Sequence, residues 1–474
     1  MKNFGEKKET PGFDDVIDIP LEIFPSKPKN LKKGKKKNNI ILFFIILFLF
    51  LGIFFVFFRP FLIEKFSHDD ELVDDSDVRW RKIEISKEEN AYYQLLELEE
   101  SFSLTTEEKD VIKKMIKGAV VEESFIKELS IKYEHALNLF SQASEKLKYQ
   151  NPRFFNPDSI TMEDFDFSSL AVAWEYVAQL QTLRAFVLMQ EKKYDEAIEE
   201  TMKSIRIAQL IEESQCTTIE YLSARAMKEV GMNAARKIFI LAGPVDIEWE
   251  QYLEEIHRYS RNEIAIISAF KSEYHGQALA IATLSEGNPG MISSIFQKEA
   301  EYQEDFSEKL KNTYHFKPNK TRNIFAQNTR IFIREVDALC VESNFFDKSK
   351  SPAEQIQLYF EENSIGKKLV YTYGIDPFDL MEKRCEEDVF VGASEITLAL
   401  KYFYHQKGYY PETLKELVPQ YLPEISKDPF DGNDLKYNKE RKILYSVGYD
   451  GADSKGEGFE GDWNSPDIIF SVNW

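Results

Sequence analysis

The chain has 474 residues, with 60 Lys and Arg against 81 Asp and Glu and a formal net charge of −21. This length allows about two to four domains of ordinary size. With 43% hydrophobic residues, the chain is neither disordered nor of low complexity. The strong acidity argues against a nucleic-acid partner, because phosphates require a basic surface.

The charge is unevenly distributed along the chain. Residues 1–39 hold ten lysines and six acids, and seven of those lysines lie within residues 27–37, where there is no acid. Beyond residue 60 the chain soon becomes acidic, with six acids between Asp69 and Asp77. This asymmetry predicts that the two parts face different surroundings, and we expect residues 1–39 to form a basic cytoplasmic tail.

Between these parts lies the run Ile40–Phe58, nineteen residues without a charge. A helix of this run would span about 28 Å, close to the thickness of a bilayer core. No small-residue cleavage site follows it, so we interpret residues 40–60 as an uncleaved, single-pass transmembrane signal-anchor. The positive-inside rule places the N-terminus in the cytoplasm and the rest in the periplasm or another extracytoplasmic space. The cytoplasmic (inner) membrane is therefore a predicted partner.

Helical patterns dominate after a predicted linker at residues 61–85. Ser86 with Glu89 and Thr105 with Glu108 fit capping boxes, which open helices. Apolar residues then recur three and four apart, for example between Leu170 and Leu188. The sequence predicts a helical ectodomain at residues 86–385.

One predicted helix pair resembles a tetratricopeptide hairpin. Ala185–Leu188 leads through Lys192 and Lys193, which replace the usual turn glycine, into a second amphipathic helix ending near Ile211. No second copy follows at the period of about 34 residues that such repeats require. A single hairpin in an irregular helical domain is favoured over a repeat array, which would bind peptides on a concave face.

The chain contains no familiar catalytic motif. HExxH, GxxxxGK[ST], GxSxG and GxGxxG are absent, and no two of the six histidines lie within five residues of each other. We therefore predict no enzyme and name no catalytic residue. The alternative is an envelope hydrolase with carboxylates in a cleft of the helical domain, which requires buried acids of raised pKa.

The pattern changes near residue 386. A helix is expected from about Phe390 to Gln406, ended by Gly408, and strands are expected at residues 435–437, 442–447 and 468–474. The predicted fold class is mainly α with a small α+β C-terminal domain, residues 386–474. That domain is a helix plus a short antiparallel sheet, and an N-terminal transmembrane helix precedes the helical ectodomain.

The C-terminal segment resembles the C-terminal domain of the type II secretion major pseudopilin. The resemblance rests on an ordered series of short motifs: Gly408-Tyr409-Tyr410-Pro411, Leu414, Leu417-Val418, Tyr421-Leu422-Pro423, Asp428-Pro429-Phe430, Tyr445-Ser446-Val447-Gly448 and Asp450-Gly451. It implies a pilin-like helix on a small sheet, with a calcium-binding loop before the last strand. Gly34 precedes three lysines rather than an aromatic residue or Met, and no Glu lies in the apolar run, so processing as a pilus subunit is not predicted.

The loop before the last strand has a composition that suits calcium. It holds six acids and one lysine between Asp450 and Asp467, and calcium prefers carboxylate, carbonyl and water oxygens. The resemblance maps the calcium ligands, with a structural role, onto Asp450, Asp453, Asp462 and Asp467. A solvated acidic loop without an ion is the open alternative.

The three cysteines, Cys216, Cys340 and Cys385, leave at least one thiol unpaired, and a Cys340–Cys385 bridge is possible. We expect an envelope protein with a structural or interaction role related to secretion or envelope assembly. Its partners would be envelope or secretion proteins, reached through Tyr409, Tyr410 and Trp463 unless these are packing residues. The oligomeric state does not follow from the sequence.

Overall fold

The structure is a computed structural model that describes residues 73–80, 83–120, 122–152, 168–259, 263–285, 316–336, 340, 362–373 and 377–472. Contacts divide the chain into two compact units, Met1–Phe66 and Ser67–Trp474. The first unit, with the predicted tail 1–39, the predicted membrane segment 40–60 and the first residues of the predicted linker, lies outside the described residues. The described fold belongs to the second unit.

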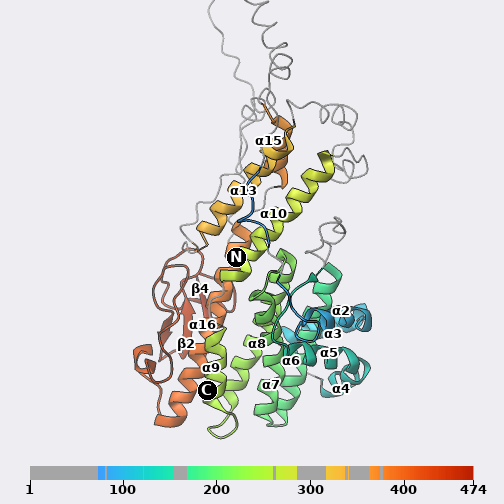
Figure 1. Ribbon diagram of the computed structural model, residues 1–474. Helices are drawn as coiled ribbons and strands as arrows, with labels where there is room; N and C mark the ends of the chain where they lie inside the picture. Colours follow the sequence, from blue (N-terminus) through green and yellow to red (C-terminus); the bar gives the residue numbers. More distant parts are fainter. Residues whose placement is uncertain are drawn as a thin grey trace, which may run out of the picture. The chain divides into compact units, whose positions relative to one another are not determined.

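The second unit begins with a series of helices (Figure 1). They are α2 (Tyr92–Ser101), α3 (Thr106–Ile116), α4 (Glu123–Lys132), α5 (Glu134–Ser144), α6 (Ser168–Gln190), α7 (Tyr194–Glu212), α8 (Thr218–Leu241) and α9 (Trp249–Arg258). Thr105 opens α3 with the predicted capping box to Glu108. Ser86 and Glu89 are joined instead by bonds from the Glu89 N–H to the Ser86 hydroxyl and from that hydroxyl to the Glu89 carboxylate, within a turn, and α2 begins only at Tyr92.

The predicted pair of helices at residues 185–211 is confirmed as α6 and α7. The turn between them places Lys192 at φ 61°, the left-handed conformation that a glycine usually adopts. Ala185 and Ala197 are fully buried, as expected where two helices approach closely. The relation of this pair to tetratricopeptide repeats stays a prediction.

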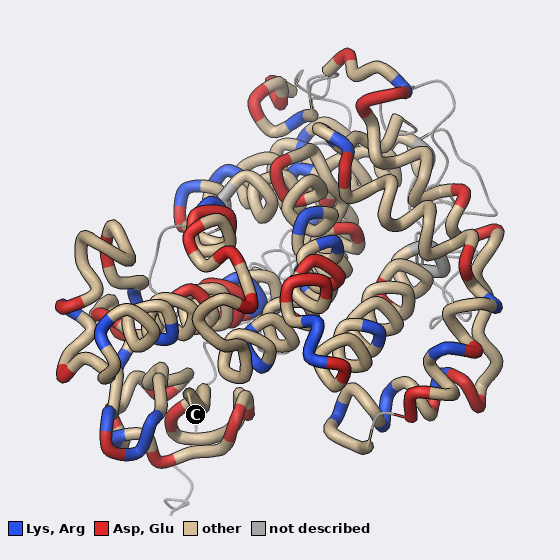
Figure 2. Tube along the Cα trace, turned by 90° about the horizontal axis from the view of Figure 1, so that it is seen from below, with Lys and Arg blue, Asp and Glu red and all other residues tan. Residues whose placement is uncertain are grey.

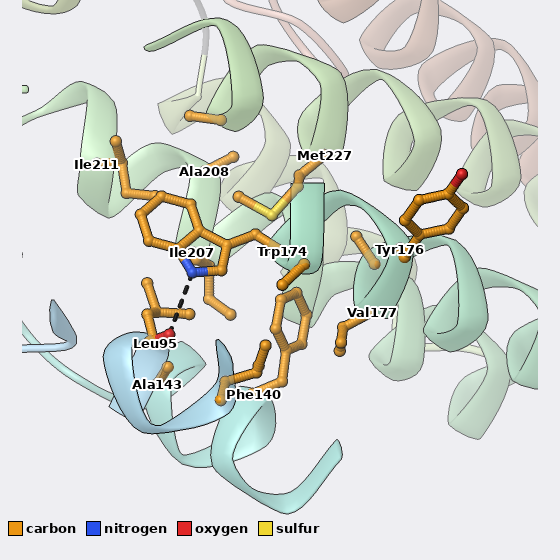
Figure 3. Packing of buried hydrophobic residues seen from close by; sticks show 14 of the residues in the cluster. Leu95, Phe140, Ala143, Trp174, Tyr176, Val177, Ile207, Ala208, Ile211 and Met227 are labelled. Atoms are coloured by element: carbon orange, nitrogen blue, oxygen red, sulfur yellow. Dashed lines mark hydrogen bonds between the residues drawn. The ribbon is translucent and has the colours of Figure 1, made fainter. Parts of the chain in front are cut away.

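Trp174 of α6 is the centre of the first hydrophobic core (Figure 3). Its indole Nε1 donates to the carbonyl oxygen of Leu95 on α2 at 3.2 Å, which satisfies the one polar atom of a fully buried ring. Phe140 of α5, Ile207 of α7 and Met227 of α8 belong to the same core. This core therefore joins the short helices α2 and α5 to the long helices α6, α7 and α8.

A second group of helices comprises α10 (Glu263–Ser285), α13 (Pro318–Arg334) and α15 (Ser364–Tyr373). Residues 73–80, which we expected to belong to the linker, pack against α10 and α13. Val78 is fully buried in their core, and Asp75 accepts hydrogen bonds from Tyr274 of α10 and from Arg322 of α13. The described part of the expected linker is thus a docked segment.

The longest described helix is α16 (Pro377–Lys407), which contacts α8 and α9. It ends as predicted at Gly408, whose φ is 81° and whose N–H donates to the carbonyl oxygen of Tyr404 at 2.8 Å. The short 3-10 helix η4 (Leu414–Leu417) follows, opened by a capping box between Thr413 and Glu416.

The strands form one sheet in the order β1-β2-β4-β3, built from β1 (Lys436–Asn438), β2 (Ile443–Ser446), β3 (Gly458–Glu460) and β4 (Asp467–Ser471). β2 pairs antiparallel with β1 and β4, whereas β3 pairs parallel with β4. On one face Leu444, Ile468 and Phe470 enter the second large core, which also contains residues of α8 and α16. On the other face Ile443, Tyr445 and Ile469 form a small cluster of their own.

These observations correct the predicted fold class. The sheet is mixed rather than antiparallel, because β3 enters it beside β4 in the same direction. The C-terminal module has no separate core, since α16 begins before the expected boundary at residue 386 and its Phe390 is buried together with Met232 of α8. In the described ranges no helix is long and apolar enough to cross a membrane, and the predicted segment, residues 40–60, lies outside those ranges.

Candidate functional site

The four predicted calcium ligands are placed mainly as turn formers. Asp467 is fully buried at the start of β4, where its carboxylate accepts the backbone N–H groups of Ser454 and Gly456 at 3.2 and 2.6 Å. Asp450, Asp453 and Asp462 accept N–H groups two residues further along, those of Ala452, Lys455 and Asn464. The carboxylates of Asp450, Asp453 and Asp462 therefore each stabilise a local turn, whereas that of Asp467 ties the middle of the loop to the start of β4.

These acids do not gather around a common point. Within the described ranges, no three His, Cys, Asp or Glu side chains are placed to share a metal ion. The oxygen donors have the chemistry that calcium requires, but their oxygens already serve backbone N–H groups. Calcium binding stays a prediction for this loop.

Of the three predicted contact aromatics, Tyr409 is the most exposed, at 57%. The Tyr410 ring stacks on that of Tyr404, with centroids 4.5 Å apart, and Trp463 packs against the second core. Tyr409 is therefore the member of this set that lies most open to a partner.

A buried ionic cluster that we did not predict joins α7, α8 and α16. Lys228 of α8 has no exposed surface and donates to Glu212 of α7, to Glu387 of α16 at 2.7 Å and to Gln209 of α7 at 3.1 Å. An ammonium group buried at this depth is stable only when its charge is balanced and its hydrogen bonds are filled.

The pKa values of the two carboxyls of this cluster are shifted in opposite directions. Burial and the nearby Glu387 charge raise the pKa of Glu212 well above its usual range, although Lys228 opposes this. Burial also acts on Glu387, but Lys228 and a hydrogen bond from Glu212 hold its pKa below the usual value. Burial works against the charge of Lys228, yet the two carboxyls raise its pKa. The two carboxyls of the cluster therefore have pKa shifts of opposite direction, with Lys228 between them.

Glu387 belongs to a run of five residues, 384–388, that we name the α16 hub. Arg384 donates to the carbonyl oxygen of Val336, just after α13. Cys385 forms a disulfide with Cys340. The backbone N–H of Cys340 donates to the carbonyl oxygen of Pro429 at 3.1 Å, so the bridged segment also contacts the C-terminal module. Cys216 is the remaining thiol, buried and free.

The hub also holds the acidic loop in place. Glu386 accepts hydrogen bonds from Arg225 of α8 and, at 2.7 Å, from the hydroxyl of Tyr449, the residue before Asp450. The Tyr449 ring lies edge-on to Phe430 at 4.9 Å. Through consecutive side chains, one stretch of α16 therefore contacts α7, α8, the end of α13 and the C-terminal module.

Two other buried carboxyls of raised pKa serve as local anchors. Burial raises the pKa of Glu220, which caps α8 at Thr217 and also bonds Tyr149. Burial likewise raises the pKa of Asp428, which accepts the N–H groups of Val447 and Phe430 at 2.8 and 3.1 Å. Both carboxyls are occupied by the protein's own donors.

The remaining carboxyl with a raised pKa in the described ranges is Glu175. Burial raises its pKa, and it accepts a hydrogen bond from Ser223 at 3.2 Å. A general acid must reach the substrate atom that it protonates. Glu220 and Asp428 are buried among protein donors, so these two carboxyls join elements of the fold.

The hub was not predicted because its residues are mostly charged, and a run of charged residues is typical of a helical face exposed to solvent. Glu386-Glu387-Asp388 reads as an acidic run, and its partners lie about 160 positions away at Arg225 and Lys228. The sequence feature that could have indicated the hub is Cys385, one of only three cysteines, which directly precedes this acidic run. Comparisons of the chain with protein-family models, curated proteins and solved structures found no match, so the pseudopilin resemblance also stays a prediction.

Proposed function

We propose that this chain is a protein-binding scaffold that works outside the cytoplasm, in envelope assembly or secretion. The observation that carries the proposal is the α16 hub, which uses buried charges and a disulfide to fix the acidic C-terminal module against the helices. Rigid presentation of a module favours binding, because less conformational entropy is lost when the partner docks.

The disulfide supports the location. Disulfides form and persist in oxidising compartments and are rare in the cytosol. Cys340 and Cys385 are bridged, whereas Cys216 is enclosed in the first core. A bridge in a chain with so few cysteines fits a protein that folds after export.

The charge pattern supports a binding role of ordinary protein–protein type. Figure 2 shows Asp and Glu residues interspersed with Lys and Arg residues along the described helices. Mixed charges of this kind keep a surface soluble without creating one large basic field for nucleic acid. The excess of acids in the loop from Asp450 to Asp467 stands out against this mixture.

The proposal is tested by the size and thiol state of the native protein. Cells that express the full chain are treated with a thiol-blocking reagent, gently solubilised and separated on a native gel. We expect an assembly larger than the monomer and a bridged Cys340–Cys385 pair. A protein that runs only as a monomer, with three free thiols, would contradict both parts of the proposal.

A further inference from the structure

The outer edge of β3 is open in the part of the sheet that the structure describes. β3 ends the strand order β1-β2-β4-β3, and only β4 pairs with it. Glu457 and Gly461 direct backbone groups toward β4, since the Glu457 carbonyl accepts from Asp467 and the Gly461 N–H donates to Ile469. Backbone groups of successive residues in a strand point alternately to its two sides. The N–H and C=O groups of Gly458 and Glu460 therefore point away from β4, toward the open edge.

The side chain at the centre of this edge is apolar and exposed. Phe459 is 72% exposed, more than any other aromatic residue that the structure describes as exposed. It pairs with Ile468 of β4, and paired residues of neighbouring strands lie on the same face. Ile468 belongs to the core shared with α8 and α16, so Phe459 extends this apolar face beyond its helical cover.

The surroundings of the edge are acidic. Glu457 and Glu460 flank Phe459 and are both exposed. On the helical side, two cations of α8 interact electrostatically with Glu460: Lys237, which is exposed, and Arg236, which is buried with its guanidinium 4.7 Å from the centroid of the Phe470 ring. An incoming chain therefore meets the carboxylate of Glu457 at this edge, and a basic segment complements it.

We propose that the outer edge of β3 binds an extended, lysine- or arginine-containing segment of a partner protein as a fifth strand. Backbone groups of Gly458 and Glu460 pair with the added strand, and an apolar side chain of the partner covers Phe459. The carboxylate of Glu457 selects a basic flank of the segment. This inference rests on the proposed scaffold function and names the class of segment that it binds.

The test measures binding of labelled eight-residue peptides to the full chain by fluorescence polarisation. The probe alternates lysine and valine, and the comparison peptide alternates glutamate and valine. We expect the lysine peptide to bind more tightly, and N-methylation of its alternate residues to abolish binding. Phe459→Ser should weaken binding about tenfold, the usual effect of losing one buried aromatic contact.

Two further variants distinguish binding at the β3 edge from non-specific binding of the peptide elsewhere on the surface. Glu457→Lys should also weaken binding of the lysine peptide, because it reverses a flanking charge. Ile131→Ser removes another exposed apolar side chain, 77% exposed on α4, and should leave binding unchanged. All three positions are exposed, so thermal melts should show retained folding. Glu460 is not varied because its carboxylate accepts the Ser471 N–H at 2.6 Å.

Equal binding of the lysine and glutamate peptides, or equal effects of Phe459→Ser and Ile131→Ser, overturns the proposal. A wild-type dimer that becomes a monomer on Phe459→Ser assigns the edge to a second copy and overturns it as well. If the native assembly persists unchanged with Phe459→Ser, the edge is not the binding site, whereas the scaffold function stands.

Discussion

Lys228 of α8 and Glu387 of α16 form an ion pair with 2.7 Å between Nζ and Oε1, at a depth where Lys228 has no exposed surface. Glu212 of α7, whose pKa burial raises well above its usual range, completes the cluster as the second carboxyl that Lys228 contacts. This pair links α8 to α16, and breaking it leaves an uncompensated charge in the core.

Replacing Lys228 with methionine should lower the free energy of unfolding by about 3–5 kcal/mol, the usual cost of an uncompensated buried charge. Urea denaturation measures the change. The matched control is Lys127→Met, which breaks the exposed pair with Glu123 on α4 and should change stability little. Equal losses in the two variants would mean that the buried cluster has no special role.

Glu212 should make stability depend on pH. Its pKa in the folded protein is raised well above 4.5, the usual value that it regains on unfolding. Between these two values the folded state holds a proton that the unfolded state has released, so stability falls as the pH rises above about 4.5. In Glu212→Gln the amide oxygen still accepts the hydrogen bond from Lys228, but the side chain can no longer gain or lose a proton. We expect its stability relative to the wild type to increase from pH 5 to pH 8, and a constant difference would refute the assignment.

The Cys340–Cys385 bridge should contribute about 2–4 kcal/mol by restricting the unfolded chain. Cys340→Ser should lose this amount in oxidising buffer, and reducing agent should lower the wild type to the same level. Cys216→Ala serves as the control, since its thiol is free and its removal should leave the redox dependence intact. A wild type insensitive to reductant would show that the bridge does not stabilise the fold.

Local structure was predictable wherever neighbouring residues decide it. The capping box at Thr105 and the left-handed cap at Gly408 depend on residues within four positions, and both formed as expected. β3 was missed because three residues, Gly458 to Glu460, are too short to show an alternating pattern. Its glycine is required by the sheet, since a Cβ on Gly458 would lie 1.9 Å from the carbonyl oxygen of Asp467.

Tertiary structure was less predictable for a physical reason. From the sequence we placed a domain boundary at Glu386. In the structure Glu386 and Glu387 lie inside the core, because ion pairs with residues of α8 compensate their charges. The arrangement of Asp450 and Asp462 in separate turns of the loop was not foreseen. Long-range compensation of charge leaves no local pattern in a single sequence.

Calcium binding by the loop is tested by thermal melts of the full chain in calcium, magnesium and chelator. If Asp450, Asp453, Asp462 and Asp467 hold the ion, a hundredfold excess of calcium over its dissociation constant should stabilise the fold by about 2.7 kcal/mol. Asp450→Asn combined with Asp453→Asn should remove the effect without disturbing Asp467. Equal stabilisation by magnesium would count against a calcium site.

The scaffold proposal is tested most directly by photo-cross-linking in cells that express the full chain. A photoreactive amino acid replaces Tyr409 in the C-terminal module or, as a control, Val120 between α3 and α4, which is 83% exposed. We predict a discrete product of higher mass from position 409 and none from position 120. Uncross-linked chain alone at position 409, or the same products from both positions, would contradict the proposal that the C-terminal module binds a partner.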